Sequence, residues 1–119
     1  MPRIIDSPAR VTAVGNKPKL IDEYVGRVRS SDDALSIAHM RSPGGWSEPY
    51  QRPEFDEHTL VLAGMLRVEH EGGALDVRAG QAVIVKSGER VRYSTPGADG
   101  AEYVAVCVPA FTPDRAKRE

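Results

Sequence analysis

The segment EHTLVLAG, residues 57–64, decides the fold of this chain. A glutamate is followed by a short apolar run that stops at Gly64, and a second run, MLRVEHE at 65–71, begins directly after it. Helical periodicity is nearly absent from both runs, whereas alternation of apolar and polar residues is typical of half-buried strands. We therefore expect one strand on each side of Gly64.

The same pattern recurs along the rest of the chain, where short apolar or alternating runs are separated by Gly, Pro, Ser and Asp. These further runs cover 23–30, 34–40, 74–80, 81–88, 90–96 and 102–110. The two glycines of HEGGAL can adopt positive φ and predict a tight hairpin between the runs that flank them. So many short strands with turns between them predict an all-β sandwich or barrel.

The bulk composition indicates one soluble domain over residues 1–119. Sixteen basic residues against seventeen acidic ones leave a formal net charge of −1, which gives no electrostatic case for nucleic acid or an anionic membrane as a partner. No segment is apolar over the length of a membrane span, so we expect a cytoplasmic protein. Cys107 is the single cysteine, and we expect it to be a small buried hydrophobe.

A long irregular loop is predicted at 40–55, where MRSPGGWSEPYQRPEF holds three prolines and two glycines. Such loops often carry ligand contacts. Trp46 and Tyr50 could cover a barrel mouth, pack the loop down, or lie in a dimer interface. At the other end of the chain, Thr112 and Pro113 predict one capped helical turn, followed by frayed residues.

The glutamate and glycine of the opening segment resemble the first motif of the cupin superfamily, which ends in a glutamate, six residues and a glycine. Glu57 and Gly64 match that spacing. The resemblance implies a cupin-type double-stranded β-helix, a jelly-roll barrel, over about residues 34–111. It also implies that N-terminal strands are exchanged or packed at a dimer interface.

The second cupin motif is matched only in part. The family pattern runs glycine, five residues, proline, one residue, glycine, two residues, histidine. Gly80 and Gly88 keep the glycine spacing, while Lys86 stands in the place of the proline. Val91 stands where the metal-binding histidine would be.

The resemblance also implies two histidines just before Glu57, and the chain lacks them. Those positions hold Gln51 and Pro53 or, in the other spacing, Tyr50 and Arg52. With Val91 as well, a histidine-rich Fe, Mn or Zn site copied from the family is not expected. An alternative is a divalent cation such as Mg²⁺, Ca²⁺ or Mn²⁺ held by oxygen ligands. Its candidate ligands are Glu48, Gln51, Glu54 and Glu57.

Glu57 has two open interpretations. The resemblance directs its side chain into the barrel, so His58, as the next residue of a strand, faces outward. A buried carboxylate must be paired or protonated. Arg52 or Arg90 could pair with it in a structural ion pair. Alternatively, a raised pKa would make Glu57 a general acid or base.

Tyr93 points the same way as Val91 by strand alternation, which the resemblance directs inward. Its phenol would then form a polar pocket with Glu57 and Gln51, although a core tyrosine is an equal alternative. We predict Glu57 and Tyr93 as catalytic residues. The predicted ligand-binding residues are Gln51, Arg52, Tyr50, Trp46 and Val91.

Among cupins, the ending YSTPGADGAEYVAVCVPAF resembles the small ethanolamine-utilisation branch, but one fold hosts many functions and no substrate follows from it. We predict a cupin that binds a small organic molecule, as a lyase- or isomerase-type enzyme using Glu57. The alternatives are a cation-dependent enzyme, a non-catalytic sensor module, or a barrel filled by its own side chains. The outward residues Leu60 and Leu62 predict an apolar face covered in a homodimer.

Overall fold

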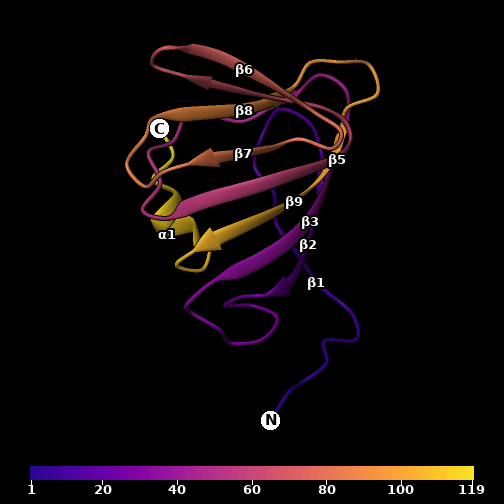
Figure 1. The fold of residues 1–119 in the computed structure, drawn as a ribbon, viewed down its shortest axis with the longest axis vertical. Coiled ribbons are helices and arrows are strands. Elements are labelled where there is room, and N and C mark those ends of the chain that lie inside the picture. Colours follow the sequence, from indigo (N-terminus) through magenta and orange to yellow (C-terminus); the bar gives the residue numbers. More distant parts are fainter.

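The computed structural model describes residues 1–119 and contains nine strands and one short helix (Figure 1). The elements are β1 (Ala9–Val11), β2 (Leu20–Val25), β3 (Ser36–Ser42), β4 (Trp46–Ser47), β5 (Asp56–His70), β6 (Gly73–Arg78), β7 (Ala82–Val85), β8 (Val91–Thr95), β9 (Ala101–Val108) and α1 (Pro113–Ala116). All strand pairings are antiparallel, and the all-β prediction is confirmed.

Strand β5 runs through both sheets of the jelly roll. Its first part, 56–64, pairs with β9 and β7, and its second part, 65–70, pairs with β6 and β8. One sheet therefore has the order β1-β2-β3-β9-β5-β7, and the other has the order β6-β5-β8-β4. The two predicted strands around the first motif are thus a single bent strand.

The bend in β5 depends on Gly64. Its φ of +75° lies in the left-handed region, and a Cβ at this position would lie 2.1 Å from the carbonyl oxygen of Gly100. A residue with a side chain meets both a backbone strain and a clash with main chain there. Gly64 is therefore required for β5 to pass from one sheet to the other.

The hydrophobic core lies between the two sheets. Its largest cluster consists of Trp46, Val61, Leu66, Val68, Val77, Val83, Val85, Val91, Tyr93, Ala101 and Tyr103. Cys107 belongs to a smaller cluster with Phe55 and Ala116, and only 3% of it is exposed. Burial raises the pKa of its thiol, and so does the nearby Glu57 carboxyl. The expectation of a buried small hydrophobe at Cys107 is confirmed.

The predicted strand at 23–30 is wrong in its second half, because β2 ends at Val25. Gly26 follows with a φ of +149°, and its carbonyl accepts hydrogen bonds from the backbone N–H groups of Ser30 and Asp32. The Glu23 carboxylate accepts two more, from the backbone N–H groups of Val28 and Arg29. These bonds close a turn where sequence alternation indicated a strand.

The C-terminal tail is ordered, contrary to the prediction that it frays. Thr112 caps α1 as expected, since its hydroxyl accepts a hydrogen bond from the Arg115 backbone N–H. Beyond α1, residues 117–119 run beside 50–52, where the Arg52 N–H donates to the Lys117 carbonyl at 3.2 Å and the Glu119 N–H to the Tyr50 carbonyl at 2.8 Å. These bonds hold the tail against the barrel.

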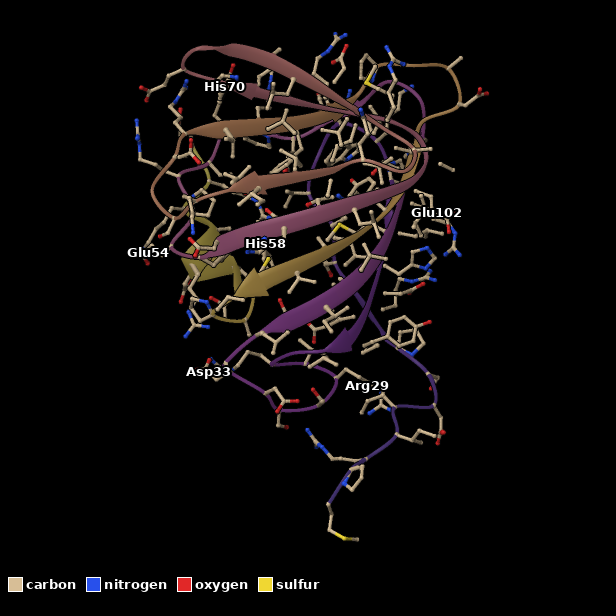
Figure 2. All side chains as sticks on the ribbon, viewed as in Figure 1. Arg29, Asp33, Glu54, His58, His70 and Glu102 are labelled. Atoms are coloured by element: carbon tan, nitrogen blue, oxygen red, sulfur yellow. The ribbon has the colours of Figure 1, made fainter.

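The outer face of β5 is apolar and exposed, as predicted. His58, Leu60 and Leu62 point away from the core, and Ile84 of the neighbouring β7 is also exposed (Figure 2). A covering second copy stays a prediction. The N-terminal strand β1 pairs with β2 of its own chain, so strand exchange also stays a prediction. The single helix of the fold is far too short to cross a membrane.

Candidate ligand-binding site in the barrel

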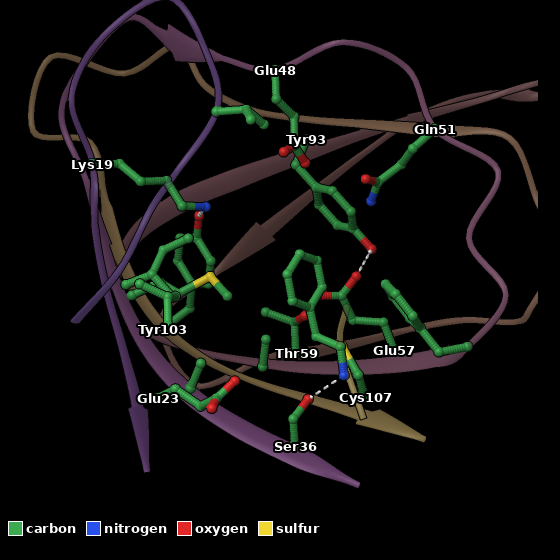
Figure 3. Close-up of a pocket in the computed structure, with 18 of the residues that line it drawn as sticks. Lys19, Glu23, Ser36, Glu48, Gln51, Glu57, Thr59, Tyr93, Tyr103 and Cys107 are labelled. Atoms are coloured by element: carbon green, nitrogen blue, oxygen red, sulfur yellow. Dashed lines mark hydrogen bonds between the residues drawn. The ribbon is translucent and has the colours of Figure 1, made fainter. Parts of the chain in front are cut away.

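A cavity of about 60 Å³ lies inside the barrel (Figure 3). Its walls come from both sheets, and it is completed by the N-terminal segment, through Val11, Val14 and Lys19, and by the tail, through Phe111 and Arg118. Most of its lining residues are hydrophobic. A water molecule needs about 10–15 Å³ on this scale, so the cavity accommodates roughly four to six waters or a ligand of similar size.

Glu57 carries its carboxyl into this cavity. It lies on β5 opposite Cys107 of β9, its side chain shares the inward face with Thr59, and only 9% of it is exposed. The Tyr93 hydroxyl donates a hydrogen bond of 3.0 Å to Glu57 Oε1. Burial raises the pKa of Glu57, and the Tyr93 hydrogen bond offsets only part of that effect. Burial, together with the Glu57 charge, also raises the pKa of Tyr93.

Glu48 is a second carboxyl in the cavity. Burial raises its pKa to about 7, helped by the charge of Glu57 and opposed by the charges of Lys19 and Arg118. The side chain has no hydrogen bond within the protein, so only the charges of Lys19 and Arg118 favour its ionised form. Two carboxyls that each favour the neutral form therefore share one small space, a typical arrangement for proton-transfer sites.

Lys19 supplies a positive charge that the sequence did not indicate. Its ammonium group donates a hydrogen bond of 2.9 Å to the Tyr103 hydroxyl, which also contacts the Ser42 hydroxyl at 2.8 Å. It lies 4.0 Å above the centre of the Trp46 ring. No carboxylate oxygen lies within 4.0 Å of it, so the charge is held by aromatic faces and hydroxyls rather than by an ion pair.

Gln51 and Arg118 meet at another side of the cavity. Their backbones form an isolated antiparallel bridge, which directs the two side chains to the same side. Gln51 is 4% exposed, and its Oε1 atom is buried without a hydrogen-bond partner, as is Arg118 Nε. Gln51 was predicted from its spacing to Glu57. Arg118 was missed because no motif links the tail to the barrel.

Five of the residues predicted for the site lie outside the cavity, and three of these lie toward the surface. Arg52 binds Glu71 and the Gly88 carbonyl at the surface, and Tyr50 donates a hydrogen bond to Glu69. Glu54 is exposed and forms a long ion pair of 3.6 Å with Lys117 (Figure 2). These three residues lie outside the cavity because residues 50–54 alternate as in a strand, with 50, 52 and 54 facing outward while 51 and 53 are buried.

Trp46 and Val91 are core residues rather than ligand contacts or a lid. Trp46 lies on β4, is 1% exposed and donates a hydrogen bond of 3.2 Å to the Val14 carbonyl. Val91 starts β8 and is also 1% exposed. Neither lines the cavity.

Neither predicted ion pair of Glu57 forms. Arg52 binds Glu71, and Arg90 forms a two-bond pair with Glu119, at 2.6 and 2.8 Å. Both arginines lie at the surface, whereas Glu57 faces the barrel. The structural ion-pair interpretation of Glu57 is therefore wrong, and its hydrogen-bond partner is Tyr93.

The donor set in the cavity does not fit the metal centre that the sequence resemblance implies. Of the family's four ligand positions only Glu57 carries a suitable donor, since the valine at 91 is packed in the core. The oxygen-ligand alternative is also incomplete, because Glu54 lies outside. No group of three or more His, Cys, Asp and Glu side chains is arranged so that it could hold a metal ion.

Comparison with known proteins identifies one relative by sequence. The chain is 46% identical over 101 residues to a Myxococcus xanthus protein named Endoribonuclease YbeY, a match that covers 85% of this chain and 34% of that protein. The chain thus spans about a third of that relative, and the name describes the whole protein. No family model matches the chain.

Solved structures share its architecture. A Salmonella typhimurium protein named for ethanolamine utilization superposes with a TM-score of 0.66 and 24% identity, over 78% of this chain and 71% of that one. A predicted oxalate decarboxylase from Thermotoga maritima superposes with a TM-score of 0.71 and 21% identity, over 87% and 92% of the two chains. At this level of identity the similarity establishes the fold alone.

Proposed function

Because this chain has the cupin fold that its sequence motifs predicted, we propose that its barrel cavity binds a small organic molecule and that Glu57 transfers a proton to or from it. One observation carries the proposal, namely a buried carboxyl that faces the barrel cavity and accepts a hydrogen bond from a phenol. A carboxyl placed in this way is held for use as an acid or a base.

The chemistry follows from the raised pKa of Glu57. In its ionised form the carboxylate removes a proton from a carbon next to a carbonyl or carboxyl group, and the electron pair of the broken C–H bond stays on the substrate as an enolate. Return of the proton to a neighbouring carbon gives an isomerase. If the electron pair instead forms a double bond to the neighbouring carbon, a leaving group on that carbon departs with the electrons of its own bond, which gives a lyase.

Two neighbours support this role. The Tyr93 hydroxyl, at 3.0 Å from Glu57 Oε1, fixes the orientation of the carboxyl and keeps its own proton, because its pKa is raised well above the ordinary value. The Lys19 ammonium provides positive charge in a largely apolar cavity, where it stabilises the negative charge of an enolate. Glu48 offers a second site for the proton.

Exchange of substrate hydrogens with solvent deuterium tests the proposal on a panel of candidate substrates. The protein is incubated in D₂O with small hydroxy acids, keto acids and aldehydes, and loss of C–H signals is followed by proton NMR. We expect catalysed exchange for at least one compound. Glu57→Gln abolishes it, Tyr93→Phe slows it by about 10- to 100-fold, and the surface variant Glu54→Gln has no effect.

Exchange that continues in Glu57→Gln contradicts the assignment of the proton-transferring residue. Binding of a compound without exchange indicates a non-catalytic ligand-binding module instead. Circular dichroism spectra and melting temperatures of the three variants verify that any loss of exchange does not come from unfolding. Glutamine preserves the shape of the neutral carboxyl, so Glu57→Gln is expected to fold.

A further inference from the structure

Arg118 is a cation without a counter-ion in the wall of the cavity. No carboxylate oxygen lies within 4.0 Å of its guanidinium, and its Nε–H is enclosed without an acceptor. Only the Phe111 ring, 5.5 Å from the guanidinium carbon, contacts its face. Arg118 as a whole is half-buried, but a buried N–H without an acceptor is costly, and a bound anion would remove that cost.

The cavity holds a second cation that forms no ion pair within the protein. Lys19 has three N–H donors, of which only the one to Tyr103 is used within the protein. Three carboxyls also line the cavity. Glu23 accepts hydrogen bonds from two backbone N–H groups, and burial raises the pKa of Glu48 and Glu57. Neither cation forms an ion pair within the protein, so both are available to an anionic ligand in the cavity.

Gln51, beside Arg118, requires that the ligand also present a hydrogen-bond donor. Its buried Oε1 atom accepts hydrogen bonds and has no donor in the protein. Because Gln51 and Arg118 face each other across their backbone bridge, one ligand can reach both. That ligand must present an acceptor to the guanidinium and a donor to the amide oxygen, as a carboxylate with an adjacent hydroxyl group does.

We infer that the ligand of this cavity is a small hydroxycarboxylate, whose carboxylate binds Arg118 and whose hydroxyl donates to Gln51 Oε1. The volume of about 60 Å³ limits it to roughly the size of lactate. In Figure 3 the Tyr93 hydroxyl lies between the Gln51 amide and the Glu57 carboxyl, so a ligand held by Gln51 would lie beside the two residues proposed for proton transfer. This inference names the substrate class for the proposed function and rests on it for the catalytic role.

Binding of matched acids and amides tests the inference separately from catalysis. Lactate and glycolate are compared with lactamide and glycolamide, which have nearly the same shape but no charge. Affinities are measured by protein NMR chemical-shift titration at constant ionic strength. We expect each acid to bind at least tenfold more tightly than its amide.

Variants identify the group that recognises the anion. Arg118→Gln is expected to remove the tenfold preference for the acid, and Arg118→Lys, which keeps the charge without the planar fork, to retain part of it. Lys117→Gln is the matched control in the same tail, because its side chain pairs with Glu54 outside the cavity. Glu57→Gln should still bind lactate even though it exchanges no hydrogen, which separates the two proposals.

The inference is overturned if the amides bind as tightly as the acids, or if neither acid binds at high millimolar concentration. It is also overturned if Arg118→Gln and Arg118→Lys both fold and retain the full preference. A preference for the acid with no hydrogen exchange in any compound refutes the proposed proton transfer and leaves the anion site standing.

Discussion

Replacement of Glu48 by glutamine should stabilise this protein, and only at neutral and alkaline pH. The ordinary pKa of 4.5 applies to the unfolded chain, whereas burial raises the pKa of Glu48 to about 7 in the folded one. Below pH 4.5 the carboxyl is protonated in both states, so the neutral glutamine side chain, which resembles the protonated acid, changes little. Between pH 4.5 and 7 the unfolded chain loses the proton while the folded chain keeps it.

The size of the effect follows from this difference. Each pKa unit corresponds to about 1.4 kcal/mol, so the folded wild-type protein loses up to about 3 kcal/mol relative to Glu48→Gln as pH rises to 7. Above pH 7 the difference stays constant. We expect the free energies of unfolding to agree at pH 4 and the variant to be more stable by about 2–3 kcal/mol at pH 8.

Urea denaturation between pH 4 and pH 8.5, followed by tryptophan fluorescence, measures this difference directly. Glu54→Gln is the control, because Glu54 is exposed and its long ion pair with Lys117 is expected to be worth less than about 1 kcal/mol. A variant that is less stable than the wild type at pH 8 would show that Glu48 is ionised and favourably paired in the folded state. The interpretation that the carboxyls in the cavity hold their protons would then be wrong.

Three further predictions concern the fold. Gly64→Ala should lower the free energy of unfolding by about 3 kcal/mol or more, because backbone strain at φ +75° adds to a clash with main chain. Gly80→Ala, which has open space around it, should lower the free energy of unfolding by only about 1 kcal/mol, and equal losses in the two variants would refute the role of the close approach. We propose that a second copy covers the face containing Leu60 and Ile84. Ile84→Asp should then convert the dimer into a monomer, as measured by sedimentation. A wild-type species of 13.0 kDa at micromolar concentration would disprove the dimer. The buried Cys107 thiol should react with an aromatic disulfide reagent at pH 8 only after denaturation, and rapid labelling of the native protein would contradict its burial.

The fold could be predicted because its main determinants are local. The residues between Glu57 and Gly64 specify an inward carboxyl and a bend, and both depend on strand alternation and on one glycine conformation. The hairpin at HEGGAL was predicted for the same reason, and the structure pairs His70 with Gly73 as expected. In contrast, β2 ends at Val25 because of hydrogen bonds to Gly26 and Glu23 that no alternation pattern encodes.

The site could be predicted only in its centre. Glu57, Tyr93 and Gln51 were identified through the family resemblance and Glu48 as a possible oxygen ligand for a cation, and all four reach the cavity. The cations were missed. Lys19 precedes β2 and Arg118 lies in the tail, so each enters the cavity through long-range packing of a chain end against the barrel. Such contacts leave no periodic signal in the sequence.

A carbon-13 NMR titration of the glutamate carboxyl groups tests the central claim most directly, with Glu57→Gln and Glu48→Gln used to assign the two cavity residues. We predict that both carboxyls titrate above the ordinary glutamate range, and that Glu57→Gln lowers the pKa of Glu48, since the Glu57 charge contributes to raising it. If every glutamate of the protein titrates in the ordinary range, the barrel does not hold protons for transfer and the proposed chemistry is refuted.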